Sequence, residues 1–270
     1  MPFKAVRVGE FEIIAIQAQP DRVANATDFF PASNPSDLDF LFAQNPSFFS
    51  GNSQDLKFTQ SVFVVRTESQ TILIDTGIPV DAEGAMVLSS LREAGISADQ
   101  IHTVVLTHRD LDHVGGGVAD GKPVFRNARY VIGQSEYQAF RVDASKRDQF
   151  AKFIEPLSDL NMLDVVPDDA ELVPEMNFWL TPGHRSAATS VLLGDVALFV
   201  ADVWHCPIQV THPEWSIKFD SDPDLAATTR LAVIDRAERD GLLVAVPHSP
   251  FFGLGHVLTQ GESRIWRSLV

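Results

Sequence analysis

Four side chains of metal-binding type lie within six positions of one another, directly after a short apolar run at residues 104–106. They are His108, Asp110, Asp112 and His113. Neutral imidazoles and carboxylates are the ligands that borderline and hard divalent ions take in proteins. Four such side chains cannot all face an apolar interior unless a positive charge compensates them. The cluster therefore favours a metal site over a solvated loop in which Arg109 pairs with Asp110 or Asp112.

Three more candidate ligands follow other apolar runs downstream. They are His184, which follows Pro182-Gly183, then Asp202, and then His248, which follows Pro247. Short apolar runs bounded by glycine or proline are typical of buried strands. The strands that end at these residues are predicted at 178–181, 196–201 and 242–246. A set of strands that delivers ligands at their ends is therefore expected.

The remaining sequence alternates between strand and helix patterns. Strands are predicted at residues 11–16, 61–66, 71–75, 101–107, 128–132 and 190–193. Helices are predicted at residues 80–94, 135–142, 146–157 and, from a cap at Asp222 to a stop at Gly241, at 223–240. This alternation is typical of an α/β protein.

Residues 19–57 have a different character, because four prolines interrupt them and an irregular segment is predicted. The segment carries six phenylalanines: Phe29, Phe30, Phe40, Phe42, Phe48 and Phe49. Two interpretations stay open. The rings either form a pocket wall or subunit contact, or they anchor the segment to the core.

Composition limits the classes of partner. The chain of 270 residues is 45% hydrophobic, which suffices for one large domain over 1–270. A formal net charge of −15 argues against nucleic acid and anionic membranes as partners. One cysteine, Cys206, excludes an intrachain disulfide, and no apolar run reaches membrane-spanning length. The N-terminal residues lack the apolar core of a signal peptide, so a cytoplasmic location is expected.

The ordered set of candidate ligands resembles that of the metallo-β-lactamase superfamily. The first motif of that family is His-x-His-x-Asp-His, and its later Gly-His, Asp and His match Gly183-His184, Asp202 and Pro247-His248 here. The turn Asp75-Thr76-Gly77 is also similar to one common in the family. The resemblance implies an αββα sandwich, in which two mixed sheets are flanked by helices. Length and the phenylalanine-rich segment look most like the branch with methyl-parathion-hydrolase-like enzymes and acyl-homoserine lactonases.

The same resemblance implies a site for two divalent ions. The first ion would take His108, Asp110 and His184, the second would take Asp112, His113 and His248, and Asp202 would bridge them. Asp110 departs from the family, which has histidine there, and a third carboxylate hardens the site. Zinc is expected first, with manganese or iron as alternatives. Because aspartate is shorter than histidine, occupancy by a single ion is a further alternative.

The implied activity is that of a metal-dependent hydrolase of an ester, lactone or organophosphate bond, with a metal-bridging hydroxide that Asp112 and Asp202 orient. Two alternatives are a redox or dehalogenating metalloenzyme on the same fold and a non-catalytic metal-binding protein. His205 lies where the lactonases carry a tyrosine that contacts substrate. It is predicted to donate a proton or to act as an extra ligand, or else it is a hydrogen-bonded loop residue.

Aromatic residues flank the candidate ligands and predict a small apolar or aromatic substrate. They are Trp204, Phe251 and Phe252. Few cations lie near the ligand positions in sequence, Arg109 and Arg185 being the exceptions, which argues against anionic substrates. A homodimer joined through the phenylalanine-rich segment is expected. His102, His212 and His256 lack the strand-end context and are predicted to be structural or surface residues.

Overall fold

A computed structural model describes residues 1–269 as two seven-stranded sheets packed face to face. The strands of the first sheet, in sheet order, are β1 Phe3–Val8, β2 Phe11–Asn25, β3 Asp55–Arg66, β4 Thr71–Ile74, β5 Thr103–Leu106, β8 Arg129–Gly133 and β9 Leu163–Val166. Those of the second are β10 Glu171–Val173, β11 Met176–Leu180, β12 Thr189–Leu193, β13 Ala197–Phe199, β14 Leu243–Ala245, β15 Leu254–Gln260 and β16 Ser263–Ser268. A small separate ribbon pairs β6 Val118–Ala119 with β7 Lys122–Pro123. Both large sheets are mixed, because each contains parallel and antiparallel pairs.

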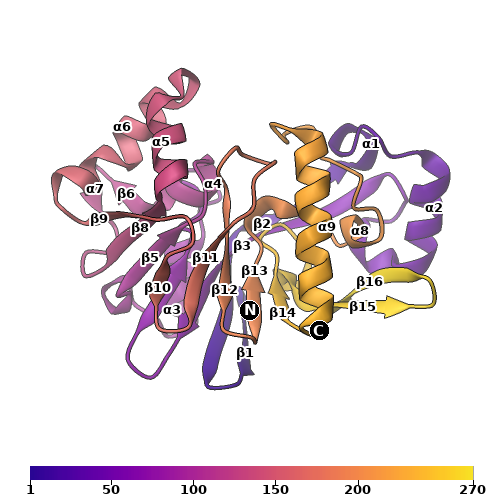
Figure 1. The fold of residues 1–270 in the computed structure, drawn as a ribbon, viewed down its shortest axis with the longest axis horizontal. Coiled ribbons are helices and arrows are strands. Elements are labelled where there is room, and N and C mark those ends of the chain that lie inside the picture. The colour runs from indigo at the N-terminus through magenta and orange to yellow at the C-terminus, as the bar shows by residue number, and fades with distance from the viewer. Residues whose placement is uncertain (270) are drawn as a thin grey trace.

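Helices cover the outer face of each sheet (Figure 1). The α-helices are α1 Ala26–Phe29, α2 Pro35–Gln44, α3 Val87–Glu93, α4 Leu111–Val114, α5 Gln134–Val142, α6 Arg147–Phe153, α7 Glu155–Asp159, α8 Ile208–Thr211 and α9 Pro223–Arg239. Short 3-10 turns are η1 Pro46–Phe48, η2 Ala98–Gln100, η3 Gly115–Gly117, η4 Ala144–Lys146, η5 Ala201–Val203 and η6 Phe251–Gly253. Helices α3, α5, α6 and α7 pack on the first sheet, and α9 packs on the second. This is the expected αββα arrangement, and the predicted fold class is confirmed.

The central strands are buried on both faces, which explains why they read as continuous apolar runs. Alternate side chains of β5 enter different cores: Val105 lies between the sheets, whereas Val104 and Leu106 lie under the helices. In the second sheet, Phe199 likewise faces the first sheet while Leu198 faces α9. A slip by one residue would send each of these side chains into the other core, so packing fixes the register and with it the positions of the strand ends.

Two predicted helices are shorter than expected. The helix predicted at 80–94 begins only at Val87, because the preceding stretch includes Gly84, which has φ of +79° and interrupts helical geometry. Its stop is as predicted, with Gly95 at φ of +76° directly after the cap. The helix predicted at 146–157 is divided into α6 and α7 at Ile154. Pro156 lacks the N–H that would continue the first helix.

The prediction of irregular structure for residues 19–57 was wrong. The segment contains the second half of β2, both N-terminal helices and the start of β3. Side-chain caps at Asn25 and Asn34 begin α1 and α2. The pairing of β2 with β3 shifts register between Gln17 and Arg22, so the proline-containing part stays in the sheet. Hydrogen bonding with β3, rather than local propensity, determines its structure.

The six phenylalanines of this segment divide between anchoring, pocket lining and exposure. Phe29 packs against the core under α9 and also lines the pocket described below. Phe30, Phe48 and Phe49 are buried in the core under α9, and Phe42 packs against it. Phe40 is the exposed ring, at 61%. The homodimer through this segment stays a prediction, for which Phe40 is the remaining support. Light scattering over a range of concentrations would refute the dimer if it gave a constant mass of 29.7 kDa.

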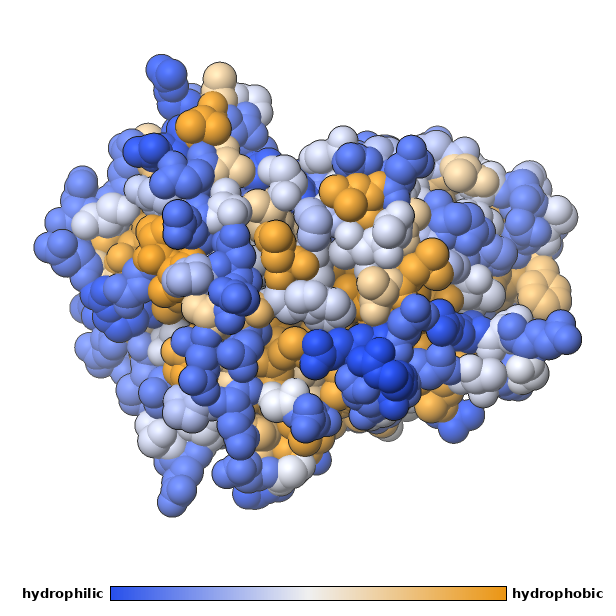
Figure 2. All heavy atoms as spheres, viewed as in Figure 1, coloured by the Kyte–Doolittle hydropathy of each residue, from blue (hydrophilic) through white to orange (hydrophobic). Residues whose placement is uncertain are grey.

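Among residues 1–269, no helix has both the length and the apolar character needed to cross a bilayer. On the face of the molecule in Figure 2, apolar residues form several separate patches among hydrophilic ones. This face is therefore not dominated by one continuous apolar surface.

Candidate metal centre

The candidate ligands come from four loops that follow strands of the two sheets. The first motif follows β5, His184 lies between β11 and β12, Asp202 follows β13 and His248 follows β14. Their side chains converge at one edge of the sandwich, where distances of 3.2 to 3.9 Å separate neighbouring nitrogen and oxygen atoms. The structure thus brings all seven predicted ligands together.

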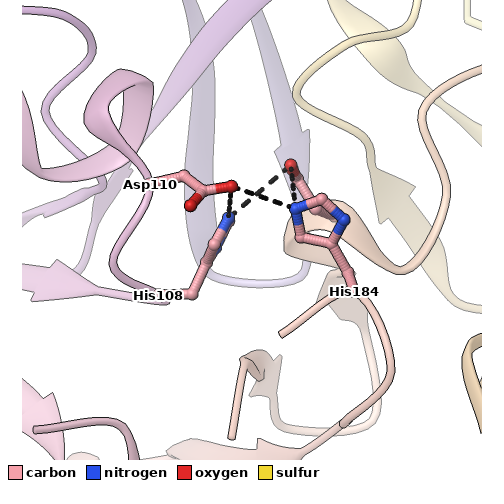
Figure 3. A group of neighbouring side chains, drawn as sticks. His108, Asp110 and His184 are labelled. Atoms are coloured by element: carbon pink, nitrogen blue, oxygen red, sulfur yellow. Dashed lines mark hydrogen bonds and ion pairs between the residues drawn. The ribbon is translucent and has the colours of Figure 1, made fainter. Parts of the chain in front are cut away.

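The first group consists of two histidines and two aspartates whose ligand atoms all lie within 4.8 Å of one another. They are His108, Asp110, His184 and Asp202. Nε2 of His184 lies 3.2 Å from Oδ2 of Asp110 and 3.3 Å from Oδ2 of Asp202. Nε2 of His108 lies 3.7 and 3.6 Å from the same two oxygens. Figure 3 shows the side chains of His108, Asp110 and His184 directed at one another.

The second group, Asp112, His113 and His248, lies on the other side of Asp202. Nε2 of His113 and Nε2 of His248 both lie 3.2 Å from Oδ1 of Asp202. Asp112 Oδ2 is 3.6 Å from His248 and 3.9 Å from His113. Because the first group faces Oδ2 and the second faces Oδ1, Asp202 has the geometry of a bridge between two positions.

Three of the imidazoles are held from behind by hydrogen bonds at Nδ1, which directs Nε2 into the site. The partners of His108, His113 and His184 are Thr107 Oγ1 at 3.0 Å, Asp75 Oδ2 at 2.7 Å and Asp220 Oδ1 at 2.9 Å, respectively. Asp75, from the turn that resembles the family's, also accepts hydrogen bonds from the main chain and the hydroxyl of Thr107. Asp220 was missed because it follows no strand and belongs to no recognisable motif.

A pair of divalent ions fits this donor set. Nε2 of His108, Nε2 of His113 and Oδ1 of Asp202 are buried and have no hydrogen-bond partner among the described residues. Leaving such atoms unpartnered costs about 1–3 kcal/mol each. Burial acts to raise the pKa of Asp202, but the surrounding histidines outweigh it and hold the pKa well below its ordinary value. The carboxylate is thus an anion surrounded by nitrogen donors, as a cation site requires.

His205 also lies at the site. Its Nε2 is 3.0 Å from Oδ2 of Asp202, and its ring stacks on that of His248 with centroids 5.0 Å apart. Burial, only partly offset by Asp202, lowers the pKa of His205 to about 4. A neutral imidazole is a poor proton donor, and the 3.0 Å contact leaves two of the predicted roles for His205, a hydrogen-bonded residue and an extra ligand. Asp202, His205 and His248 form a third group of suitable spacing.

A pocket of about 530 Å³ opens directly over the ligand groups. Phe29, Phe58 and Phe219 form its aromatic side. Two of the aromatic residues that flank the ligands in sequence do not line the pocket. Trp204 is fully buried in the core under α9, and Phe252 packs between the sheets. The side chain of Phe251 lies outside the described part of the structure.

The pocket holds more cations than the sequence indicated. Arg185 lines it as expected, together with Arg22, Lys146 and Lys218, which no motif had marked. Arg109 does not line it, because its guanidinium is buried against the carboxylate of Glu136 at 2.9 Å. The alternative in which Arg109 pairs with Asp110 or Asp112 is therefore wrong. His102, His212 and His256 lie outside the site, each hydrogen-bonded elsewhere.

The chain is similar in sequence to several N-acyl homoserine lactonases. It is 26% identical over 227 residues to one from Bacillus thuringiensis, which covers 74% of this chain and 82% of the relative. It is 25% identical over 202 residues to one from Bacillus cereus, which covers 66% of this chain and 76% of the relative.

Solved structures share the fold over nearly the whole chain. AidC, described as a dizinc quorum-quenching lactonase, has a TM-score of 0.84 at 24% identity and covers 99% of this chain and 97% of its own. The hydrolase AbOPH has a TM-score of 0.86 at 22% identity and covers 100% and 98%. The sequence model of the superfamily matches residues 56–248, which include every candidate ligand. The chain therefore belongs to the metallo-beta-lactamase superfamily.

Proposed function

We propose that this metal-dependent hydrolase acts on an ester, lactone or organophosphate bond, with a lactone as the first candidate. One observation carries the proposal: the two oxygens of Asp202 face separate ligand groups at the floor of a pocket that has an aromatic wall. The curated relatives named as N-acyl homoserine lactonases support the lactone among the three bond types.

The residues divide the work between holding ions and placing the substrate. The first group would hold one divalent ion and the second group another, with zinc expected first and manganese or iron as alternatives. Bound there, the ions would lower the pKa of a bound water and polarise the bond to be broken. Asp202 and the part-exposed Asp112 present carboxylate oxygens beside the ligand groups, which suits them to accept a hydrogen bond from the attacking water. His205 holds Asp202 in place through its 3.0 Å contact.

The aromatic side of the pocket suits a small substrate with an apolar or aromatic acyl group. The ring centroid of Phe29 lies 4.5 Å from that of Phe58 and 6.2 Å from that of Phe219. It lies 6.0 Å from the ring centroid of His205. This wall therefore connects directly to the ligand groups. An acyl chain packed along it would be held next to the bond to be broken while water is excluded from that side.

The test begins with chelation, restoration with Zn²⁺ or Mn²⁺, and assay against acyl-homoserine lactones, aryl esters and phosphotriesters. Turnover that is lost and restored with the metal is the expected result. Phe29→Ser should raise KM for a long-chain lactone and leave a short-chain lactone nearly unchanged, because it removes binding along the chain. Phe40→Ser, an exposed ring of the same segment, is the matched control.

Two results would overturn the proposal. Bound metal without turnover of any substrate class would favour the non-catalytic metal-binding protein. Bound iron with activity that oxidants abolish, and no hydrolysis, would favour the redox or dehalogenating alternative.

A further inference from the structure

The carboxylate of Asp110 is held by a two-point ion pair with Arg185. Nε of Arg185 donates to Oδ1 at 2.9 Å, and Nη2 donates to Oδ2 at 2.5 Å. Only 13% of the Asp110 side chain and 16% of the Arg185 side chain are exposed. Lys146 adds a single longer contact of 3.6 Å to Oδ1. Such paired, part-buried hydrogen bonds are the strong form of the carboxylate–guanidinium interaction.

The guanidinium of Arg185 is also fixed independently of Asp110. Its Nη1 donates to the carbonyl oxygens of His184 at 2.8 Å and Phe219 at 2.7 Å, and to Ser221 Oγ at 3.2 Å. These acceptors are set by the loop that carries His184 and by the segment that precedes α9. The positive charge beside the first ligand group is therefore a built-in property of those loops.

The pair leaves Asp110 able to face the ligand group. A carboxylate oxygen has two lone pairs, so Oδ2 can accept from Arg185 and still present one to the atoms opposite. Those atoms are Nε2 of His184 at 3.2 Å and Nε2 of His108 at 3.7 Å. The pair as a whole has no net charge. A site that contains it has the same total charge as a site with a neutral imidazole at position 110 and no cation at position 185.

We propose that Asp110 and Arg185 act as one neutral ligand unit, in which Arg185 offsets the charge that aspartate brings to a position where the superfamily motif has histidine. Each residue is then needed because the other is present. The inference depends on the metal-binding part of the proposed function and not on which bond is hydrolysed.

Asp110→His restores the common motif, yet it should weaken metal binding in this chain. That change leaves the guanidinium in place, without its carboxylate, next to the position of a divalent cation. We expect the weaker-binding ion to lose about 10- to 100-fold in affinity, the range seen when a group behind a ligand is changed. Asp110→His combined with Arg185→Gln removes the uncompensated charge and should recover most of the loss.

The experiment measures Zn²⁺ and Mn²⁺ affinity and stoichiometry of the full chain by competition with a chromophoric chelator. It compares wild type, D110H, R185Q and the double variant D110H/R185Q. D110H/R129Q is the matched control, because Arg129 makes a two-point pair with Asp164 away from the site. This control should bind the ions no better than D110H alone.

Thermal unfolding of the same proteins in chelator gives a second readout without metal. D110H should lower the midpoint, since it leaves Nε and Nη2 of Arg185 without their acceptor. D110H/R185Q removes those two donors but also the contacts of Nη1 with the loops, so it should recover part of the loss. If D110H does not fold, Asp110→Asn with and without R185Q replaces it, because asparagine has nearly the shape of aspartate. In that series the side-chain amide would keep one acceptor and lose the charge.

Different results would contradict the ligand unit and the metal site. D110H that binds two ions as tightly as wild type, with no further effect of R185Q, would overturn the ligand unit and leave the proposed function intact. A rescue by R129Q equal to that by R185Q would also overturn it. A wild-type chain that binds neither ion would overturn the metal site and the inference together.

Discussion

Asp75 has three acceptor contacts that align the first motif. It accepts from the main-chain N–H and hydroxyl of Thr107 and lies 2.7 Å from Nδ1 of His113. Its φ is +62°, a left-handed conformation that aspartate and asparagine adopt more readily than most residues. Asp75→Asn therefore changes the charge behind His113 with little backbone strain.

Asp75→Asn should weaken metal binding about 10- to 100-fold while the fold is kept, because His113 loses a charged hydrogen-bond partner. Chelator competition measures the affinity, and far-UV circular dichroism checks the fold. In the companion variant Asp75→Ala, the thermal midpoint should fall as well, since alanine disfavours this backbone conformation. A well-folded Asp75→Asn protein with wild-type affinity would contradict the role of Asp75.

The protonation of His184 predicts how metal affinity depends on pH. Burial lowers its pKa, but hydrogen bonds with Asp110 and Asp220 outweigh burial and raise the pKa to about 9 in the metal-free chain. At neutral pH the imidazole therefore holds a proton that a metal at Nε2 must displace. The affinity for metal should therefore decrease as the pH is lowered below about 9, because more of the His184 imidazole is then protonated.

Isothermal titration with Zn²⁺ at pH 7 in buffers of different ionisation enthalpy measures the protons released. The heat of binding should change from buffer to buffer in proportion to that number. Heats that are the same in every buffer would show that no ligand releases a proton on binding.

At the scale of elements, a buried ion pair connects the first-motif loop to helix α5. The main-chain N–H and guanidinium of Arg109 both donate to the carboxylate of Glu136, at 2.8 to 3.0 Å. Glu136 is fully buried. The residue between two candidate ligands is thereby fixed to a helix that packs on the first sheet.

Glu136→Gln should reduce the free energy of unfolding by about 3 kcal/mol, since it removes the close counter-charge of a buried guanidinium and leaves only the longer 3.5 Å contact with Asp143. Urea denaturation measures the loss. Glu155→Gln, on the exposed side of α7, is the control and should change the value by less than about 0.5 kcal/mol. A loss for Glu136→Gln as small as that of the control would show that the pair does not stabilise the loop.

At the scale of the whole molecule, distant parts of the chain share one core. The core under α9 includes Ala26 and Phe30 from the N-terminal segment together with Val257 and Trp266 from the last two strands. The N-terminal segment and the second sheet cannot lose their packing independently. We therefore propose that residues 1–269 form a single domain.

A single domain of this kind should unfold in one transition. Tryptophan fluorescence and far-UV circular dichroism should give coincident urea curves, because Trp204, Trp215 and Trp266 lie in the shared core and report its loss. Two separated transitions, or different midpoints for the two probes, would show that parts of the chain unfold independently.

The local sequence determined the elements that carry the site. Strands covered on both faces require continuous apolar runs, and the end of each run marks where a polar side chain emerges. His108, Asp202 and His248 could therefore be predicted as strand-end residues. Helix α9 was predictable from its cap at Asp222 and Pro223 in its first turn. The hairpin of β15 and β16 was missed.

Only the tertiary structure decided which groups act on those residues. Asp110 and Arg185 are 75 positions apart, and Asp220 lies 36 positions from the histidine that it holds. The wall of Phe29, Phe58 and Phe219 likewise brings together parts of the chain that are distant in sequence. Burial patterns repeat every two or four residues and leave a trace in local sequence. A contact between distant loops leaves none, because it depends on how the two sheets pack and not on any neighbour along the chain.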